Sequence, residues 1–498
     1  MKLEDVTKEK ELWIRKGYEI FSYDREKMIT ETKEEPEWVH FGSGNLFRAF
    51  QAVFCDRLLD EGVLDKGIIL VGGRNSELID RYYRAFDNLH IAVTLKADGS
   101  IIKRVVGSIA ESLKIEDTER LKEIFARPSL KVVSFTITEK GYRIDEENPY
   151  FETIASLLHH RYEEGAYPLT MSSHDNCSHN GDVLKKAVMH YVDKYDDESF
   201  KNYTESKISF PISMIDKITP RPDQRIAKIL KEDGVEEIDD LDPNYYLNCF
   251  SNAEESEYLV IENDFRNGRP AWNNVIFTDR ETVDKTEKMK VCTCLNPVHT
   301  SLAIFGCLLD HHLIYEEMKD RELSLLARHI GYDEGLPMVT DPKIMDPKEF
   351  LDTVIDIRLP NPYMPDAPQR IAMDTSQKLP IRFGETLKAY IRQGKDLNEL
   401  TCIPLVFSGW LRYLTGINDK GETFELSSDP LLEEVVPLMS GYRLGDTVKE
   451  EDLLPLLSNK KIFGIDLVKA GLSDRIISYL NEMMKGPGAV RRTLKKYV

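Results

Sequence analysis

Short apolar runs rich in β-branched residues alternate with stretches of helical period between about residues 38 and 180. These runs are WVHF, GIILVG, HIAVTL, KVVSFTIT and PLTMSS. Such alternation is typical of strand–helix–strand units, in which helices cover both faces of a parallel sheet. Beyond about residue 296 the chain changes to long helical stretches such as SLAIFGCLLDHHLIYEEM and DPKEFLDTVIDIRL. The pattern predicts an α/β fold, with a doubly wound N-terminal domain followed by a mostly α-helical domain.

The chain of 498 residues exceeds the size at which a single hydrophobic core stops growing. No Gly/Ser-rich linker marks a boundary, so the change of pattern sets it. We expect residues 1–285 to form a dinucleotide-binding domain and residues 286–498 to form a helical substrate and catalytic domain. Ligands of open α/β sheets bind outside the carboxyl ends of the strands, and candidate site residues are sought there.

Charge and composition limit the partners that the chain is expected to bind. The formal net charge is -20, from 66 Lys and Arg against 86 Asp and Glu, which argues against a nucleic-acid partner. The apolar stretch LAIFGCLL at 302–309 is shorter than the roughly 20 residues of a membrane span, and the N-terminus lacks a signal-peptide pattern. The 7 cysteines form no disulfide or zinc-binding framework. We predict a soluble cytoplasmic protein with a small-molecule substrate and no metal ion. The sequence does not indicate an oligomeric state.

A glycine pair follows the first strand run. Gly42 and Gly44 stand in HFGSGNLFRAF, and a helix is expected to begin near Leu46. In a dinucleotide turn the first glycine permits the tight bend, and the second lets the backbone approach the pyrophosphate at the helix N-terminus. Arg48 is a candidate for a direct contact. Phe47 stands where the usual fingerprint has a third glycine, so an ordinary strand-to-helix turn remains an alternative.

The end of the second strand run leaves the choice of cofactor open. An acidic residue here usually binds the ribose hydroxyls of NAD, whereas this chain has Gly72, Gly73 and Arg74. Arg74 suits the additional phosphate of NADP, or it is a solvated loop arginine. We take NAD as the first choice and NADP as the alternative.

Several separated segments are similar to one family. They are HFGSGNLFRAF, SFTITEKGY, SSHDNCSHNGDVLKKAV, ISMIDKITPRP, KVCTCLNPVH and RIAMDTSQKLPIR. In this order they resemble the long-chain polyol-specific dehydrogenases, also called the mannitol dehydrogenase family, over residues 40–382. The resemblance implies a Rossmann-type domain followed by a helical domain, and metal-independent oxidation of a secondary alcohol or reduction of the matching ketone.

The segment KVCTCLNPVH carries most of the expected catalytic residues. Asn296 followed by Pro297 predicts a helix start, with Asn296 as the N-cap and His299 in the first turn. The resemblance implies that Lys290 is the general base in alcohol oxidation and the acid in ketone reduction. It also implies that the amides of Asn176 and Asn296 stabilise the charge that develops on the substrate oxygen, with His299 completing the hydrogen bonds.

The spacing of the lysine departs from the family pattern. Four residues usually separate the lysine from the asparagine, whereas five separate Lys290 from Asn296, and Val291 occupies the expected position. A one-residue bulge would restore Lys290 to the site. Lys288 is the alternative proton carrier.

Further contacts are expected in the other matching segments. Asn45, Thr138 and Lys140 are assigned to the cofactor. The resemblance implies that the substrate is anchored by polar and charged side chains, namely Asp216, Arg370 and Lys378. Arginine grips a carboxylate with two parallel hydrogen bonds, but these cations equally match the branch of the family that binds sugar alcohols.

Three functions fit these observations. The leading one is hydride transfer between a nicotinamide cofactor and an open-chain keto sugar acid, such as fructuronate with mannonate or tagaturonate with altronate. The first alternative is the interconversion of mannitol and fructose. The second, suggested by the shifted lysine, is a catalytically inactive homologue that binds a ligand.

Overall fold

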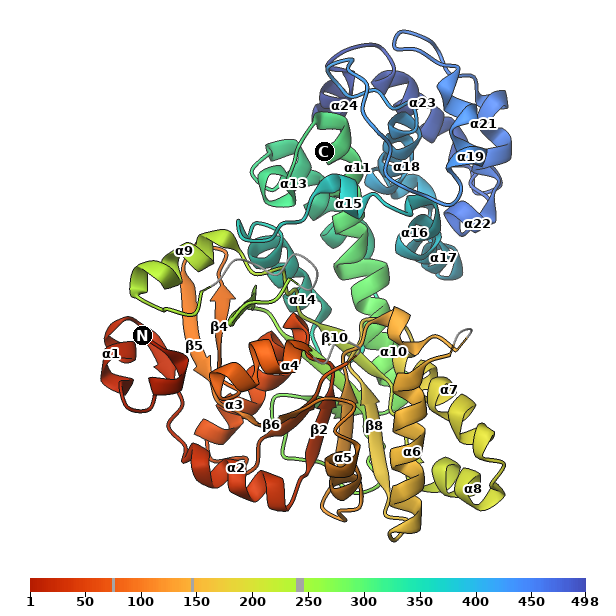
Figure 1. Ribbon diagram of the computed structural model, residues 1–498. Coiled ribbons are helices and arrows are strands. Elements are labelled where there is room, and N and C mark those ends of the chain that lie inside the picture. The colour runs from red at the N-terminus through yellow and green to blue at the C-terminus, as the bar shows by residue number, and fades with distance from the viewer. Residues whose placement is uncertain (74–76, 145–146, 239–245) are drawn as a thin grey trace. The chain divides into compact units, whose positions relative to one another are not determined.

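The computed structural model describes residues 1–73, 77–144, 147–238 and 246–498 (Figure 1). They form two compact units, unit 1 (Met1–Asp284) and unit 2 (Lys285–Val498). Every described strand belongs to unit 1. The described chain from residue 280 onward contains helices and one isolated bridge, between Ile417 and Thr423. The predicted change from an α/β to a mostly helical pattern is therefore confirmed.

A 6-stranded parallel sheet forms the centre of unit 1, in the order β6-β3-β2-β7-β8-β9. Renumbered in chain order within this sheet, the strands follow the 3-2-1-4-5-6 arrangement of a Rossmann fold. The strands are β2 (Trp38–Phe41), β3 (Ile68–Val71), β6 (Ile109–Leu113), β7 (Val132–Phe135), β8 (Leu169–Ser173) and β9 (Ile208–Ser209). The strand order reverses between β2 and β7, where ligands of such sheets bind.

One predicted strand lies outside this sheet. The run HIAVTL forms β4 (His90–Leu95), which pairs antiparallel with β5 (Ile101–Val106) in a separate 4-stranded sheet, so its assignment to the parallel sheet was wrong. The reason is the hairpin turn between them, in which the Asp98 carboxylate accepts the Ser100 N–H at 2.8 Å and Gly99 has a φ of 84°. The two edges of the parallel sheet are formed by β6 and β9, which were not among the predicted runs.

Smaller sheets and helices complete unit 1. The 4-stranded sheet runs β1-β5-β4-β11, and a 3-stranded sheet runs β10-β12-β13. The additional strands are β1 (Tyr18–Ile20), β10 (Ser213–Asp216), β11 (Phe250–Glu254), β12 (Tyr258–Glu262) and β13 (Ile276–Thr278). The helices are α1 (Lys10–Arg15), α2 (Arg25–Glu34), α3 (Ala52–Asp60), α4 (Glu77–Tyr82), α5 (Thr118–Phe125), α6 (Pro149–Glu163), α7 (Asn180–Val192), α8 (Glu198–Lys207) and α9 (Gln224–Asp233).

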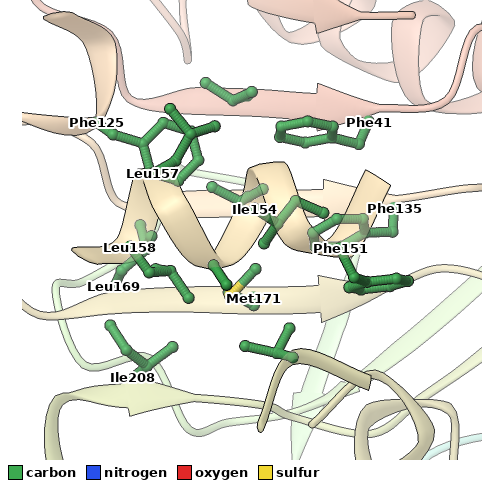
Figure 2. Packing of buried hydrophobic residues seen from close by; sticks show 14 of the residues in the cluster. Phe41, Phe125, Phe135, Phe151, Ile154, Leu157, Leu158, Leu169, Met171 and Ile208 are labelled. Atoms are coloured by element: carbon green, nitrogen blue, oxygen red, sulfur yellow. The ribbon is translucent and has the colours of Figure 1, made fainter. Parts of the chain in front are cut away.

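Helix α6 illustrates how the parallel sheet is covered. Phe151, Ile154 and Leu158 recur at three- and four-residue steps and are fully buried. Figure 2 shows these side chains packed over Phe135 of β7 and Met171 of β8. Because helices cover the sheet in this way, its strands are buried at nearly every position. The core thus fixes the strand ends at which candidate site residues emerge.

Unit 2 is built from helices. They are α10 (Arg280–Met289, which contains the division between the units), α11 (Asn296–Leu309), α12 (Ile314–Glu317), α13 (Arg321–Arg328), α14 (Pro347–Thr353), α15 (Pro368–Ile371), α16 (Thr375–Arg382), α17 (Gly384–Arg392), α18 (Cys402–Tyr413), α19 (Leu432–Val435), α20 (Pro437–Ser440), α21 (Glu450–Leu457), α22 (Lys460–Phe463), α23 (Ser473–Met483) and α24 (Ala489–Tyr497). Two of the expected helical stretches are interrupted. Asp310, with a φ of 63°, ends α11 before α12, and α14 continues as a π-helical turn, Val354–Arg358.

Helix α11 is the core helix of unit 2. The continuous helical stretch Arg280–Leu309 is long and apolar enough to cross a membrane by length and composition, but 78% of its most apolar window is buried inside the fold. Residues of α11 contact α13, α15, α16 and α18. A helix apolar on all sides is expected in such a buried position.

Candidate active site

A cavity of about 450 Å³ opens at the carboxyl ends of the parallel strands of unit 1. Its lining comes from the loops after β2, β3 and β7 and from the start of α6: Gly42, Ser43, Gly73, Thr136, Ile137, Thr138, Lys140, Gly141, Asn148 and Tyr150. The cavity therefore lies where the strand order reverses, which is the expected place for a dinucleotide.

The two glycines after β2 differ in their surroundings. Gly42 has a φ of 124°, and a Cβ added to it would overlap the Thr136 carbonyl oxygen. Only glycine fits this turn. A Cβ added to Gly44 would meet nothing within 4 Å. Gly44 thus leaves open space beside the helix that begins at Asn45, as close approach of a pyrophosphate requires.

Two polar residues of the same turn are directed into the protein. Asn45 donates from Nδ2 to the Tyr246 carbonyl at 3.0 Å. Arg48 lies in the π-helical turn η2 (Phe47–Gln51) that leads into α3, is fully buried, and donates from Nη1 to the Asn248 carbonyl at 2.6 Å. Both side chains brace the turn. The cofactor contacts expected for Asn45 and Arg48 stay predictions.

The loop after β7 is held by a buried carboxylate. Asp175 accepts the backbone N–H groups of Ile137 at 3.0 Å and Thr138 at 2.9 Å, together with the Tyr142 hydroxyl at 2.6 Å. Thr138 has a φ of 64°, an unusual conformation for a residue with a β-branched side chain. Burial raises the pKa of Asp175, while these three donors oppose the rise. The carboxylate thus fixes a strained loop that presents Thr138 and Lys140 to the cavity.

Thr136, which the sequence reasoning missed, is oriented by a buried histidine. His40 lies 2.8 Å from the Thr136 hydroxyl through Nε2 and 2.7 Å from the Ser134 hydroxyl through Nδ1, and Trp38 donates to Ser134 at 2.7 Å. Burial lowers the pKa of His40 well below its ordinary value, so the ring is neutral and one nitrogen donates while the other accepts. The available signal was the position of Thr136 directly after β7, at the strand-order reversal.

Two other predicted residues of unit 1, Asn176 and Asp216, lie outside the lining of this cavity. Asn176 is exposed in the loop after β8, at the same edge of the sheet as the cavity and next to Asp175. Asp216 is the buried last residue of β10 and pairs with Tyr258 of β12 in the 3-stranded sheet. Arg74 lies outside the described residues. The roles of all three stay predictions.

Lys290 opens a π-helical turn in unit 2. The turn Lys290–Cys294, η6, joins α10 to α11, and the N–H of Leu295 donates to the Lys290 carbonyl. A single π-helical turn accommodates one residue more than an α-helical turn. The structure therefore contains the one-residue bulge that the spacing of Lys290 and Asn296 requires. Lys290 is 5% exposed, whereas Lys288 is exposed at the end of α10.

Helix α11 begins at Asn296, with Pro297 in its first turn. The predicted start is confirmed. The N-cap residue, however, is Leu295, whose side chain makes no capping hydrogen bond, so the assignment of Asn296 as the N-cap was wrong. The bulge carries the chain directly from α10 into α11 and leaves no room for a separate cap. Consequently the Asn296 amide is not used for capping.

His299 lies in the first turn of α11 among charged groups. Its Nε2 is buried, makes no hydrogen bond within the described chain, and stands 3.7 Å from the Asp366 carboxylate. Burial lowers the pKa of His299 to about 4; Asp366 opposes this shift, and Arg382, Arg370 and Arg358 add to it. Asp366 is itself paired with Arg370. At neutral pH His299 is therefore an uncharged hydrogen-bonding group.

Two cations of α16 lie one helical turn apart. Lys378 donates from Nζ to the carbonyls of Ile371 and Met373, and its pKa is lowered to about 8, first by burial and then by Arg382. Arg382 donates from Nη1 to the Thr300 hydroxyl of α11, and burial lowers its pKa to about 10. Arg382 was missed from the sequence. Its spacing of four residues from Lys378 was the signal that would have placed both on one helix face.

Within the described residues, no group of three or more His, Cys, Asp and Glu side chains is arranged to hold a metal ion. The candidate groups of unit 2 are a buried amine, a neutral imidazole and several cations. Such groups can move a proton, donate hydrogen bonds to a developing oxyanion and bind an anionic substrate.

Both parts of the chain match family profiles. Residues 36–274 match the "Mannitol dehydrogenase Rossmann domain" and residues 282–484 match the "Mannitol dehydrogenase C-terminal domain". A D-mannonate oxidoreductase from Thermotoga maritima is 44% identical, with 99% of this chain and 98% of the relative covered.

Solved structures of similar proteins agree with these matches. A D-sorbitol dehydrogenase in substrate-free form has a TM-score of 0.81 at 26% identity, covering 96% of this chain and 97% of the other. The mannitol 2-dehydrogenase of Pseudomonas fluorescens, in a ternary complex with NAD and D-mannitol, has a TM-score of 0.67 at 27% identity, covering 96% of each chain.

Proposed function

Because the chain belongs to the mannitol dehydrogenase family, we propose that it is an NAD-dependent oxidoreductase of open-chain sugar acids. The first substrate pair is fructuronate and mannonate, since the T. maritima relative is a D-mannonate oxidoreductase that matches along the full chain. Tagaturonate with altronate and fructose with mannitol are the alternatives. The protein is proposed to act as a soluble cytoplasmic enzyme.

The observation that carries the proposal is the position of Lys290. A buried amine opens the bulge that leads into α11, and the first turn of α11 supplies Asn296 and a neutral His299. An amine, an amide and an imidazole on one short stretch of helix form a set suited to proton transfer at a carbonyl oxygen. An inactive homologue would have no need to keep the amine buried beside them.

The cavity of unit 1 fits a dinucleotide. Gly42 makes the turn that no residue with a Cβ could make, Gly44 leaves its surroundings open, and the helix N-terminus at Asn45 offers oriented N–H groups to a phosphate. When bound, the nicotinamide supplies the hydride acceptor for alcohol oxidation and the hydride donor for ketone reduction. Thr138 and Lys140 line the cavity and are proposed cofactor contacts.

The residues of the chain handle the proton and the charge. In ketone reduction Lys290 donates a proton from Nζ to the carbonyl oxygen, and in alcohol oxidation it accepts the hydroxyl proton. The Asn296 amide donates a hydrogen bond to the same oxygen as charge develops on it. His299, uncharged at neutral pH, hydrogen-bonds a substrate oxygen without adding charge. Asn176 as a second amide donor, and Asp216, Arg370 and Lys378 as substrate anchors, stay predictions from the family resemblance.

The test is cofactor oxidation across a panel of ketones. Purified protein is mixed with NADH or NADPH and with fructuronate, tagaturonate or fructose, and NADH absorbance is followed. We expect the highest kcat/KM with fructuronate and NADH. Cofactor binding without turnover of any ketose or keto sugar acid would overturn the enzyme assignment. A higher kcat/KM for fructose than for fructuronate would favour the alternative, the interconversion of mannitol and fructose.

A further inference from the structure

Arg382 is the last residue of α16, which packs against η6 and α11. Its guanidinium donates one hydrogen bond to the hydroxyl of Thr300, the neighbour of His299 in the first turn of α11. Arg382 therefore lies on the part of unit 2 that carries the proposed proton-transfer residues, although its position was not expected from the family resemblance.

Charged side chains surround this turn. Three arginines, Arg382, Arg370 and Arg358, act on His299, against one carboxylate, Asp366. Asp366 is already paired with Arg370. Among the described residues no carboxylate opposes the lowered pKa of Arg382, which burial causes. Within the described chain its only hydrogen-bond partner is the neutral Thr300 hydroxyl.

A second cation, Lys378, lies one helical turn before Arg382. Repulsion by Arg382 lowers the pKa of Lys378, while Asp374 and Asp429 oppose that shift. Lys378 uses its donors on the carbonyls of Ile371 and Met373. Arg382 has five N–H donors in a planar fork, of which Thr300 takes one. The fork is therefore the group in this cluster best able to grip a further anion.

Arg382 is partly buried. Cations removed from water are normally paired with an anion, because leaving such a charge unpaired is costly. A polyol or a neutral ketose brings no charge and would leave Arg382 uncompensated. The carboxylate of a sugar acid would supply the missing charge and match the fork with two parallel hydrogen bonds. The charge balance thus favours an anionic over a neutral substrate.

We infer that Arg382 binds the carboxylate of the sugar-acid substrate and is the residue that selects sugar acids over polyols. The inference rests on the proposed function and assigns its substrate preference to one side chain. Arg370, held by Asp366 and with 61% of its side chain exposed, is not equivalent to Arg382.

The experiment compares charged and uncharged ligands of the same chain type in Arg382→Met, Arg382→Lys and wild type. Arg392→Met serves as the matched control, because Arg392 is an exposed arginine at the end of the neighbouring helix α17. Two readouts are taken: kcat/KM for fructuronate and for fructose, and the dissociation constants of D-gluconate and D-glucitol with NADH present, by calorimetry.

Arg382→Met is expected to lower kcat/KM for fructuronate by about 100-fold, because a desolvated charge pair is lost. The dissociation constant of D-gluconate should rise by a similar factor. Values for fructose and D-glucitol change less than about threefold. Arg382→Lys keeps the charge but not the planar fork of N–H donors. Its kcat/KM for fructuronate and its affinity for D-gluconate should lie between those of wild type and Arg382→Met, with the neutral ligands unaffected. Arg392→Met behaves as wild type with all four ligands.

Equal losses for acids and neutral ligands would mean that Arg382 only supports the fold, and unchanged binding of D-gluconate would also overturn the inference. If Arg382→Met does not fold, Arg382→Lys decides between the same outcomes. A wild type that turns over no keto sugar acid, yet binds D-gluconate through Arg382, would refute the proposed function and leave the anion site standing.

Discussion

The backbone N–H of Leu295 donates a 3.0 Å hydrogen bond to the carbonyl of Lys290, five residues earlier in the chain. In an α-helix the donor would bond four residues back, so one extra residue is accommodated at this turn. The bond keeps Lys290 adjacent to the start of α11 despite the longer spacing.

This relationship predicts that deleting Val291 is tolerated. The deletion converts the π-helical turn into an ordinary α-helical one and restores the spacing that is usual in the family, so kcat is expected to stay within about tenfold of wild type. The matched control is deletion of Ala303 in the regular, buried part of α11, which rotates the following residues by about 100° and is expected to unfold unit 2. Kinetics and thermal melting measure both. If the Val291 deletion inactivates a folded enzyme, the bulge does not account for the spacing.

Replacing Lys290 by Ala is expected to lower kcat by about 10² to 10⁴, the usual contribution of a general acid or base. The dissociation constant of NADH should not change, because the proposed role concerns proton transfer alone. Lys288→Ala, at an exposed position in the same helix, is the control and should keep full activity. Partial recovery of Lys290→Ala by added ethylamine would support proton transfer. Loss of activity in Lys288→Ala with retention in Lys290→Ala would reverse the assignment.

The two glycines of the turn after β2 should respond differently to alanine. Gly44→Ala is expected to leave the melting temperature unchanged, because its Cβ enters open space. It should raise the dissociation constant of NADH at least about tenfold, because the pyrophosphate would occupy that space. Gly42→Ala is expected to destabilise the protein by more than about 1 kcal/mol, since its φ of 124° and the Thr136 carbonyl leave no room for a side chain. Fluorescence titration with NADH and thermal melting separate the two effects. Undiminished NADH binding by Gly44→Ala would place the pyrophosphate elsewhere.

His299 should make stability depend on pH in a defined window. Its folded-state pKa of about 4 lies below the ordinary value of 6.5, so the unfolded state binds the proton first as pH falls. The free energy of unfolding is therefore unaffected by His299 above pH 6.5 and decreases as pH falls toward 4, by about 3 kcal/mol in total.

His299→Gln removes the titrating group and should flatten this part of the stability profile. The buried histidines His40, His90 and His174 titrate in both proteins, so the difference between wild type and variant isolates His299. Urea unfolding at a series of pH values provides the measurement. Parallel profiles for the two proteins would show that His299 is not held neutral.

Much of the fold was predictable because it depends on local patterns. Apolar runs alternating with helical periods identified β2, β3, β7 and β8, and the Asn296–Pro297 pair identified the start of α11. The edge strands β6 and β9 were missed because Glu111 and Ser112 interrupt the apolar run of β6 and because β9 has only 2 residues. The run HIAVTL was misplaced because pairing partners are set by tertiary contacts and the hairpin turn, which a run of apolar residues does not encode.

Part of the candidate site could be proposed from the sequence. Motif similarity singled out Lys290, Asn296 and His299, which lie close together in sequence and whose roles stay predictions. It did not identify Arg382 or Thr136, because their importance arises from contacts with Thr300 and His40 across segments distant in the chain. Whether a cation has a carboxylate partner is a property of the folded surroundings, so the charge imbalance around His299 could not be predicted from composition.

The carboxylate of Asp175 has a consequence for how the sequence can diverge. The Asp175 side chain accepts hydrogen bonds from the backbone of Ile137 and Thr138 in the loop after β7. Asp175 itself lies in the loop after β8, directly before Asn176, so this one residue connects the two loops. Substitutions in either loop must remain compatible with the other. Transplanting only one of these loops from a relative would leave the carboxylate without its donors or the donors without their acceptor. We therefore expect the residues of the two loops to covary among relatives.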